Sequence, residues 1–452
     1  EIVALLKTGE ISIDDTLDAL EAHIEKIDPE INALPTRCFE RARAAARQGD
    51  RKNSVLSGIP VAIKDLTDVA GVRTTRGSML YANHVPEHSD ILVERIEANG
   101  GVIYAKSNTP EFGTGGNTFN DVFGATRNPH DVTCSAGGSS GGAAAALASG
   151  SAWLAQGSDL GGSLRTPAAF CGVTSLRPSP GLIATTPGMQ PFGVYSQSGP
   201  MARNIADLAL FADAMAGSSS LTGLSKPHLI DEFRKAVARP LKPLKIAYSE
   251  DLGITQTSPA VSAICTNAIA KLERERVNVE INHPDLGMMD AAFEVPRALD
   301  YAQSYGADLA NTREIMKPEV VWNIEKGLNL GADEIRQSMD AQGQVFANAS
   351  RFMQDYDLLI CPATIMPAYP VEERYPGYSD GLAYSEYYRW LAICCAITTT
   401  TLPVITLPCG KTDSGLPVGL QLIGKAHGER ELFALASYLE QVFSWDPLQA
   451  II

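Results

Sequence analysis

The sequence predicts an α/β protein in which one large domain, residues 1–452, holds a mixed, mostly parallel β-sheet covered by helices on both faces. Short apolar runs of strand length alternate with longer segments whose apolar residues recur at helical spacing. Such alternation is typical of a sheet that packs helices against both of its faces. The 452 residues, 45% of them apolar, are enough for a large core, and no internal repeat divides the chain.

The N-terminal part begins with a predicted helix. Ser12 and Asp15 stand three residues apart, as in a capping box, at the start of an apolar pattern of helical period. That pattern consists of Ile13, Leu17, Leu20, Ile24 and Ile27. The apolar run at residues 59–63 (IPVAI) then predicts a buried strand that ends directly at Lys64.

The later elements follow the same alternation. A helical pattern starts after Ser89 and ends at the pair Gly100-Gly101, because glycine commonly follows the last turn of a helix. Further along we expect strands over residues 102–105, 244–248, 277–281, 357–361 and 418–423, a helix from about Pro259, and a final helix. Residues 285–350 carry long helical patterns, which predict a helical cap at one edge of the sheet.

One stretch, from Leu391 to Gly410, is uncharged and has the length of a membrane span. It also contains four consecutive threonines, Thr398–Thr401, and the prolines Pro403 and Pro408. A polar run and prolines favour a buried helix end followed by a core strand, so we expect no membrane span.

The net charge and the cysteine content limit the kinds of partner that the protein can bind and the compartment in which it works. The net charge is −15 and the pI is near 5.0, and an acidic surface repels phosphate backbones and anionic lipids. We therefore expect neither nucleic acid nor a membrane as a partner. The eight cysteines form no C-x-x-C pair and no zinc-type cluster, which favours reduced thiols, no metal and a cytoplasmic location. Because Glu1 lies inside an expected helix, we expect the natural N-terminus upstream of it.

The segment from Ser135 to Pro178 has the composition of a catalytic site. It contains GGSSGG at residues 137–142, an Ala-rich helical run and GSDLGGS at residues 157–163. Glycines at this density allow backbone N–H groups to point at a ligand. N–H donors beside a serine hydroxyl are what acyl transfer requires, namely an oxyanion hole beside a nucleophile.

Two other interpretations of this segment are weaker. A flexible linker would lack the apolar helix and strand runs that interleave with these glycines. A phosphate-binding loop would carry G-x-x-x-x-G-K-[ST], or G-x-G-x-x-G after a strand, and neither pattern stands in that context here.

A histidine base is the usual partner of a nucleophilic serine. Ser139 and Ser140 each stand in a G-x-S-x-G pattern, but residues 130–136 before them are expected to form a loop rather than the apolar strand that such an elbow follows. No histidine downstream stands in a matching motif. The histidines considered are His228, His283 and His427. A serine enzyme without a histidine needs another base, and the sequence offers Lys64.

The motifs around these residues resemble those of the amidase signature family. They are G-x-P-x-x-x-K-D at residues 58–65, GGSSGG at residues 137–142 and GSDLGGSLRTPAAFCG at residues 157–172. The intervals of 75 residues from Lys64 to Ser139 and 24 residues from Ser139 to Ser163 are typical of that family. The resemblance covers nearly the whole chain, and it implies the amidase signature fold with the signature core at about residues 55–215.

The resemblance implies a Ser-Ser-Lys triad that works without a cofactor. Ser163 is then the nucleophile, Ser139 the bridging serine (usually after a cis peptide) and Lys64 the general base. The implied oxyanion donors are the backbone N–H groups of Leu160, Gly161, Gly162 and Ser163. The supporting residues are Ser140, Ser158 and Asp159, with G-S-D standing where the family usually has G-T-D.

The sequence around Lys64 suits a base. A lysine accepts a proton only when its amine is neutral, so its free pKa of roughly 10.4 must fall by several units. Burial can lower a lysine pKa by up to ~3–5 units, and Lys64 directly follows the apolar run 59–63.

Two loops, residues 111–118 and 188–195, and the segment 365–368 are expected to wall the acyl pocket. The expected lining residues are Phe112, Gly113, Thr114, Gly115, Gly116, Met189, Phe192 and Ile365. The alternative is that these methionines and phenylalanines are core residues with no role in substrate binding. Neither loop carries Arg or Lys to pair with a carboxylate, so malonamate or glutamine should bind poorly. We therefore expect hydrolysis of neutral, fairly apolar aryl or alkyl amides and anilides, with carbamates (urethanes) and esters as further substrates.

The same family includes the glutamine-hydrolysing subunit of a tRNA-dependent amidotransferase, which is the alternative function. Against it, the region 301–370 resembles that of stand-alone amidases and lacks a tyrosine-rich, basic stretch. A catalytically inactive member is disfavoured because all three triad positions are intact. A homodimer is expected because dimers are common in the family.

Overall fold

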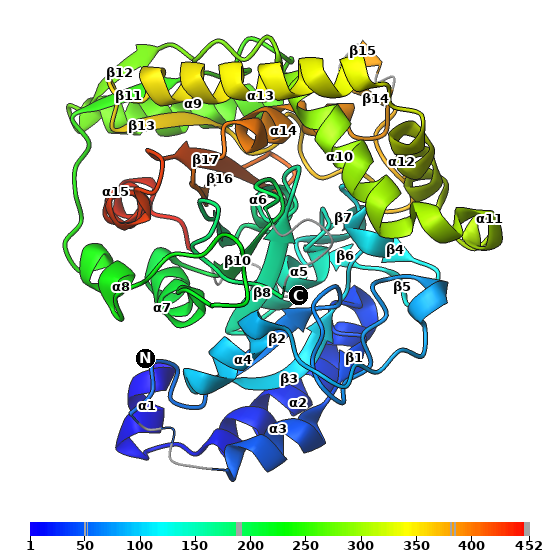
Figure 1. Ribbon diagram of the computed structural model, residues 1–452. Coiled ribbons are helices and arrows are strands. Elements are labelled where there is room, and N and C mark those ends of the chain that lie inside the picture. The colour runs from blue at the N-terminus through cyan, green and yellow to red at the C-terminus, as the bar shows by residue number, and fades with distance from the viewer. Residues whose placement is uncertain (49–50, 52, 187–191, 380–381, 384–385, 447–452) are drawn as a thin grey trace.

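A β-sheet of 11 strands runs through the molecule (Figure 1). The structure, a computed structural model, describes residues 1–452 except 49–50, 52, 187–191, 380–381, 384–385 and 447–452. In spatial order the strands are β1 (Thr36–Arg37), β3 (Val102–Ser107), β2 (Pro60–Lys64), β8 (Leu154–Asp159), β10 (Gln197–Ala202), β9 (Thr174–Arg177), β16 (Val404–Lys411), β17 (Pro417–Ile423), β13 (Leu358–Pro362), β11 (Lys245–Tyr248) and β12 (Asn278–Ile281).

The sheet is mixed, as expected, but it is not mostly parallel. Parallel pairing is confined to two groups near the edges, β3-β2-β8 and β13-β11-β12. The strands from β8 across β10, β9, β16 and β17 to β13 pair antiparallel, as does β1 with β3. One physical reason is local: β16 and β17 are joined by the tight turn 412–416, and strands joined by a hairpin are antiparallel.

Helices cover both faces of the sheet, because alternate strand residues point to opposite sides. In β2, Val61 and Ile63 join one apolar cluster and Ala62 joins another. The helices on the first face are α1 (Ile2–Thr8), α4 (Ile91–Ala98), α7 (Ile205–Met215), α8 (Glu232–Val237), α9 (Pro259–Arg274) and α15 (Glu429–Phe443). Those on the second are α2 (Ile13–Ile31), α3 (Phe39–Ala46), α5 (Gly141–Ala148), α6 (Arg165–Cys171) and α14 (Ala392–Thr399).

A further group of helices lies beside α14, at the end of the sheet formed by β13, β11 and β12 (Figure 1). These helices are α10 (Met289–Tyr305), α11 (Leu309–Thr312), α12 (Pro318–Leu328) and α13 (Ala332–Phe352). They occupy the region 285–350 in which helices were expected. Short strand pairs complete the fold: β4 (Phe119–Asn120) with β5 (Gly124–Ala125), β6 (Arg127–Asn128) with β7 (Asp131–Ser135), and β14 (Tyr378–Ser379) with β15 (Leu382–Ala383).

The expected elements are present, with small shifts at their ends. Helix α2 begins with the capping box of Ser12 and Asp15, and α4 begins after Asp90, whose side chain accepts from the backbone of Leu92. The uncharged stretch 391–410 forms α14 and β16, and no helix in the described ranges is long and apolar enough to cross a membrane. One expectation is wrong: residues 130–136 are not a loop throughout, because they contain β7, a half-exposed strand outside the main sheet.

The arrangement of β2 and β8 sets the position of the site. The two strands are parallel neighbours, so their carboxyl ends meet at one edge of the sheet. Strand β2 ends at Lys64 and β8 ends at Asp159. The glycine-rich turn before α5 brings Ser139 to the same edge, since Ser139 contacts the Lys64 side chain.

Candidate active site

Lys64 lies at the centre of a group of serine hydroxyls. Its side chain is fully buried. Nζ donates to Oγ of Ser139 at 2.7 Å, to Oγ of Ser140 at 2.9 Å and to Oγ of Ser158 at 3.1 Å. The structure therefore brings together a lysine and three serines that lie 75 or more residues further along the chain.

Burial lowers the pKa of Lys64 to about 7, although the nearby carboxylate of Asp159 opposes part of this shift. The amine therefore loses its proton near neutral pH. A neutral amine keeps two N–H donors and gains one acceptor lone pair. Lys64 can thus donate to Ser140 and Ser158 while it accepts a proton from Ser139.

The turn that carries Ser139 is packed too closely for larger residues. The peptide bond between Gly138 and Ser139 is cis. A Cβ added at Gly138 would lie 3.0 Å from the backbone N of Asn117. The backbone N–H of Ser140 donates to the carbonyl of Ser163 at 3.1 Å, which ties the two serine-bearing segments to each other.

The carboxylate of Asp159 holds the backbone after β8 in a tight turn. It accepts from the N–H groups of Gly162 at 2.9 Å and Leu164 at 3.0 Å. Arg165 donates to both of its oxygens, and Nε of Arg177 lies 3.6 Å from Oδ1. Burial opposes ionisation of this carboxyl, but the two guanidinium groups hold the pKa of Asp159 well below its usual range. The anion is therefore permanent, and it fixes the turn.

This turn supplies the backbone groups expected to bind an oxyanion. The Gly162 N–H is already donated to Asp159, so it is the least available of the four expected donors. The other three expected donors are the N–H groups of Leu160, Gly161 and Ser163. Gly162 has a φ of +117°, and a Cβ there would lie 2.7 Å from Cβ of Cys394. Glycine is therefore required at this position.

Ser139 and Ser163 line the same cavity, of about 140 Å³, which we call the serine chamber. Ser139 is buried and Ser163 is half-buried, and within the described residues no hydrogen bond joins their hydroxyls. The serine chamber is lined by Leu66, Phe112, Gly113, Gly115, Ser139, Ser158, Leu160, Gly161, Ser163, Ser196, Phe293, Arg297, Asp300, Tyr301, Ser304, Tyr305, Tyr387, Tyr388, Leu391 and Cys395. Its far walls are largely aromatic.

The structure brings only part of the expected acyl pocket to the serine chamber. Phe112, Gly113 and Gly115 line it. Three expected residues do not: the Thr114 hydroxyl bonds to that of Tyr301, Gly116 packs against Trp390, and Ile365 is buried in the core. Phe192 lines a neighbouring cavity, and Met189 lies outside the described residues.

Sequence reasoning missed the wall supplied by α10. Phe293, Arg297, Asp300, Tyr301 and Ser304 all line the serine chamber. Their spacing of three and four residues places them on one face of the helix, and this spacing was visible in the sequence. What the sequence did not show is that this face turns toward the serines.

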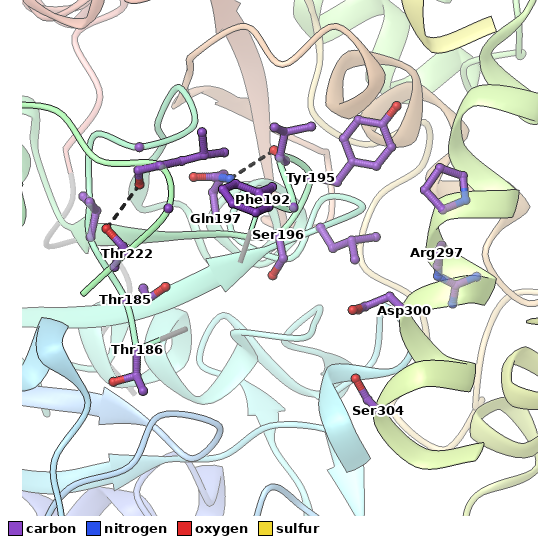
Figure 2. A pocket seen from close by; sticks show the side chains of 18 of the residues that line it. Thr185, Thr186, Phe192, Tyr195, Ser196, Gln197, Thr222, Arg297, Asp300 and Ser304 are labelled. Carbon is purple, nitrogen blue, oxygen red and sulfur yellow. Dashed lines mark hydrogen bonds between the residues drawn. The ribbon is translucent and has the colours of Figure 1, made fainter. Parts of the chain in front are cut away.

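A second cavity, of about 650 Å³, adjoins the serine chamber, and we call it the outer chamber. Figure 2 shows part of its wall: Arg297, Asp300 and Ser304 on α10 face the segment that carries Tyr195 and Ser196. The lining residues common to both chambers are Leu160, Ser196, Arg297, Asp300 and Ser304.

The three histidines considered as bases have contacts elsewhere, and none of them lines either chamber. Their partners are the Asp213 carboxylate for His228, the Pro284 carbonyl for His283 and the Lys226 amine for His427. In the ranges that the structure describes, no three His, Cys, Asp or Glu side chains gather as metal ligands would.

Known proteins similar to this chain match nearly its whole length. Residues 15–433 match the family model described as Amidase. The chain is 31% identical to an acylamidase of Rhodococcus erythropolis and 34% identical to a glutamyl-tRNA(Gln) amidotransferase subunit of Moorella thermoacetica, in each case over 98% of this chain and 95% of the relative. A bacterial aryl acylamidase of known structure has the same fold, with a TM-score of 0.91 at 24% identity over 99% of this chain and 98% of that one.

Proposed function

The chain belongs to the amidase family and is an amide-hydrolysing enzyme, and on that premise we propose that Ser163, Ser139 and Lys64 cleave amides through an acyl-enzyme. The observation that carries this proposal is the buried Lys64 Nζ, 2.7 Å from Oγ of Ser139, which lines the same chamber as Ser163. The three motifs that hold these residues meet at one edge of the sheet.

Acylation needs a proton path away from the nucleophile. Neutral Lys64 accepts the Ser139 hydroxyl proton while Ser139 accepts that of Ser163, and Oγ of Ser163 attacks the carbonyl carbon. The carbonyl electron pair moves onto oxygen, where N–H groups of the turn 160–163 stabilise the oxyanion. When the C–N bond breaks, Lys64 returns the proton through Ser139 to the leaving nitrogen, and the amine departs.

Deacylation runs the same path with water. Lys64, neutral again, removes a proton from the attacking water through Ser139, and the water oxygen bonds to the acyl carbon. Collapse of the second tetrahedral intermediate breaks the bond to Ser163 and releases a carboxylic acid. Oγ of Ser163 takes a proton back from the Lys64 ammonium through Ser139, which regenerates the starting enzyme. A carbamate or an ester presents the same carbonyl geometry, so we propose these as further substrates.

We propose that the group next to the scissile bond is neutral and fairly apolar. The aromatic walls of the serine chamber support this, with the rings of Phe112 and Tyr305 4.2 Å apart and those of Tyr387 and Tyr388 5.4 Å apart. Such rings bind aryl and alkyl groups through burial of apolar surface. A panel of para-nitroanilides, primary amides and carbamates tests the proposal. Turnover of the anilides supports it, and failure with all three classes contradicts it.

The alternative is a glutamine-hydrolysing subunit of a tRNA-dependent amidotransferase. The observation that favours it is the 34% identity to a relative of that name. The two functions differ in what the purified chain does alone. Hydrolysis of glutamine that requires a second subunit would favour the alternative.

We further propose that the enzyme works in the cytoplasm as a homodimer, with a small-molecule amide or carbamate as its ligand and without a nucleic acid partner. The eight cysteines are all unpaired thiols, which suits a reducing compartment, and the net charge of −15 disfavours nucleic acid. Sedimentation of the purified chain tests the dimer.

A further inference from the structure

Arg297 lies where the serine chamber and the outer chamber meet, since it lines both. Its side chain projects from α10 in the view of Figure 2, beside Asp300 and Ser304. Because a substrate larger than the serine chamber must pass this point, the residue can contact the part of the substrate that extends outward.

The guanidinium of Arg297 is enclosed by aromatic rings. The residue is only 7% exposed. The distances from Cζ to the ring centroids are 4.8 Å for Tyr388, 5.1 Å for Tyr387, 5.5 Å for Tyr301 and 5.9 Å for Phe293. Rings at these distances attract a cation and fix its position, but they do not neutralise it.

Among the described residues, no carboxylate forms a direct ion pair with this cation. Within the part of the chain that the structure describes, Arg297 forms no ion pair within 4.0 Å. Glu294, one turn away on α10, is paired with Lys326 and Arg389 instead. A buried cation normally has an anionic partner, because removal of a charge from water is costly. The side chain of Arg297 faces both chambers, so an anionic group of a bound substrate can take the place of that partner.

Asp300 is the other charged residue common to both chambers. Burial raises the pKa of its carboxyl, and the charge of Arg297 opposes part of that shift. The two side chains therefore influence each other without forming an ion pair. Asp300 would repel a second carboxylate at this place, so neutralising Asp300 should strengthen the binding of a substrate carboxylate.

We propose that Arg297 binds a carboxylate on the part of the substrate that reaches from the serine chamber into the outer chamber. This rests on the proposed amidase function and adds a substrate class to it: amides with an apolar group beside the scissile bond and a carboxylate further away. A planar guanidinium held by rings is suited to bidentate carboxylate binding. The hydroxyls and amides of the outer chamber, among them Thr186, Gln197 and Gln342, can solvate the rest of such a polar end.

The carboxylate can stand on either half of the amide, and two pairs of compounds distinguish the halves. Para-(butyrylamino)benzoate and its neutral counterpart para-(butyrylamino)acetophenone place the charge on the amine half. Adipic acid mono-para-nitroanilide and its neutral counterpart hexanoyl para-nitroanilide place it on the acyl half. We expect the wild type to favour the charged member of one pair by ~10-fold or more in kcat/KM, as one charged hydrogen-bonded pair implies.

Variants test whether Arg297 causes the preference for the charged substrate. Arg297→Gln should remove this preference, whereas Arg297→Lys, which keeps a cation, should retain part of it. Asp300→Asn should increase it, because the repelling charge is gone. Arg313→Gln is the control: Arg313 is an exposed arginine directly after α11, is paired with Glu325 and lines neither chamber, so the preference should not change. No charge preference in the wild type, or an unchanged preference in Arg297→Gln, would overturn the proposal.

Binding separates failure of this proposal from failure of the proposed function. Ser163→Ala cannot form the acyl-enzyme, so calorimetry on it compares para-(butyrylamino)benzoate and its acetophenone counterpart without turnover. Tighter binding of the benzoate, lost when Arg297→Gln is added, supports the role of Arg297 even if the wild type hydrolyses none of the four compounds. Equal binding of these two compounds, together with equal kcat/KM within both pairs, contradicts it.

Discussion

The burial of Lys64 makes it suitable as a general base, and the same burial lowers the free energy of unfolding. Among the residues that the structure describes, its ammonium has no carboxylate within hydrogen-bond distance, and its three closest partners are the hydroxyls of Ser139, Ser140 and Ser158. Burial brings its pKa to about 7, near the pH at which a general base is most effective. The same burial means that the folded protein resists protonation of this group.

The first prediction concerns the pH dependence of activity. Because only the neutral amine accepts a proton, kcat/KM should rise with pH along a limb whose midpoint is near 7, the pKa of Lys64. Lys64→Ala should lower activity by ~10²-fold or more and remove the limb. The matched controls are His228→Gln, His283→Gln and His427→Gln, which should keep the limb. Its loss in any one of them would refute the lysine as base.

The second prediction concerns stability. Between pH 7 and about 10.5 the unfolded lysine is protonated and the folded one is not, so the free energy of unfolding rises with pH across this window. At pH 7 and below, the destabilisation by Lys64 is greatest, of the order of a few kcal/mol. Lys64→Met should therefore be more stable than the wild type at pH 7, and the gain should shrink toward pH 10. Denaturant titrations at the two pH values measure it, and a gain that grows with pH would contradict it.

The third prediction concerns Asp159. Asp159→Asn would leave the guanidinium groups of Arg165 and Arg177 buried without their anion. We expect a loss of about 3–5 kcal/mol in the free energy of unfolding. Glu440→Gln is a useful comparison, because Glu440 is a half-buried carboxyl whose pKa burial raises to about 7, and its neutralisation should cost far less. Similar losses for both would contradict the role given to the ion pairs.

At the scale of elements, strands with continuous apolar runs were predictable and strands with polar or glycine residues were not. β2 was expected within one residue at each end because IPVAI is apolar throughout. β8 contains Gln156 and Asp159, and β10 contains Gly199 and Pro200, so neither has a strand-like apolar run. Their pairing with apolar neighbours forms them, and a single sequence does not display that pairing.

The same division applies to the candidate site. The residues expected at its centre lie within motifs, so their spacing could be recognised. The wall from α10 could not be placed, because a helical face of Phe293, Arg297 and Tyr301 fits a core as well as a cavity. Which of the two it contacts depends on how a long stretch of intervening chain packs between Ser163 and α10.

The fourth prediction tests the turn that follows β8. Gly162→Ala adds a Cβ at 2.7 Å from Cβ of Cys394, on a backbone with φ of +117°. The turn must shift, so kcat should fall by ~10²-fold or more through lost oxyanion stabilisation. Gly415→Ala is the control, because Gly415 also has a positive φ, of +86°, but open space around its Cβ position. It should lose stability and keep its kcat, and equal effects on kcat would contradict the role of the turn.

At the scale of the whole molecule, the chain contains both chambers and the full set of proposed catalytic residues. It should therefore hydrolyse anilides without a second subunit. We expect kcat/KM for an aromatic or medium-chain anilide to exceed that for malonamate or glutamine by ~10²-fold, about 2.7 kcal/mol of transition-state discrimination. In those small acids the carboxylate stays close to the scissile bond, among the aromatic walls. Steady-state kinetics on the purified chain measure the ratio, and a better rate with glutamine would favour the alternative function.

The identity of the nucleophile is the central claim, because Ser139 and Ser163 line one chamber and only one of them can carry the acyl group. A serine-directed fluorophosphonate followed by peptide mass spectrometry measures this directly. We predict one label per chain, on Ser163, with the labelling rate rising through pH 7 and the label absent in Ser163→Ala. A label on Ser139 or Ser140, or undiminished labelling of Ser163→Ala, would contradict the account.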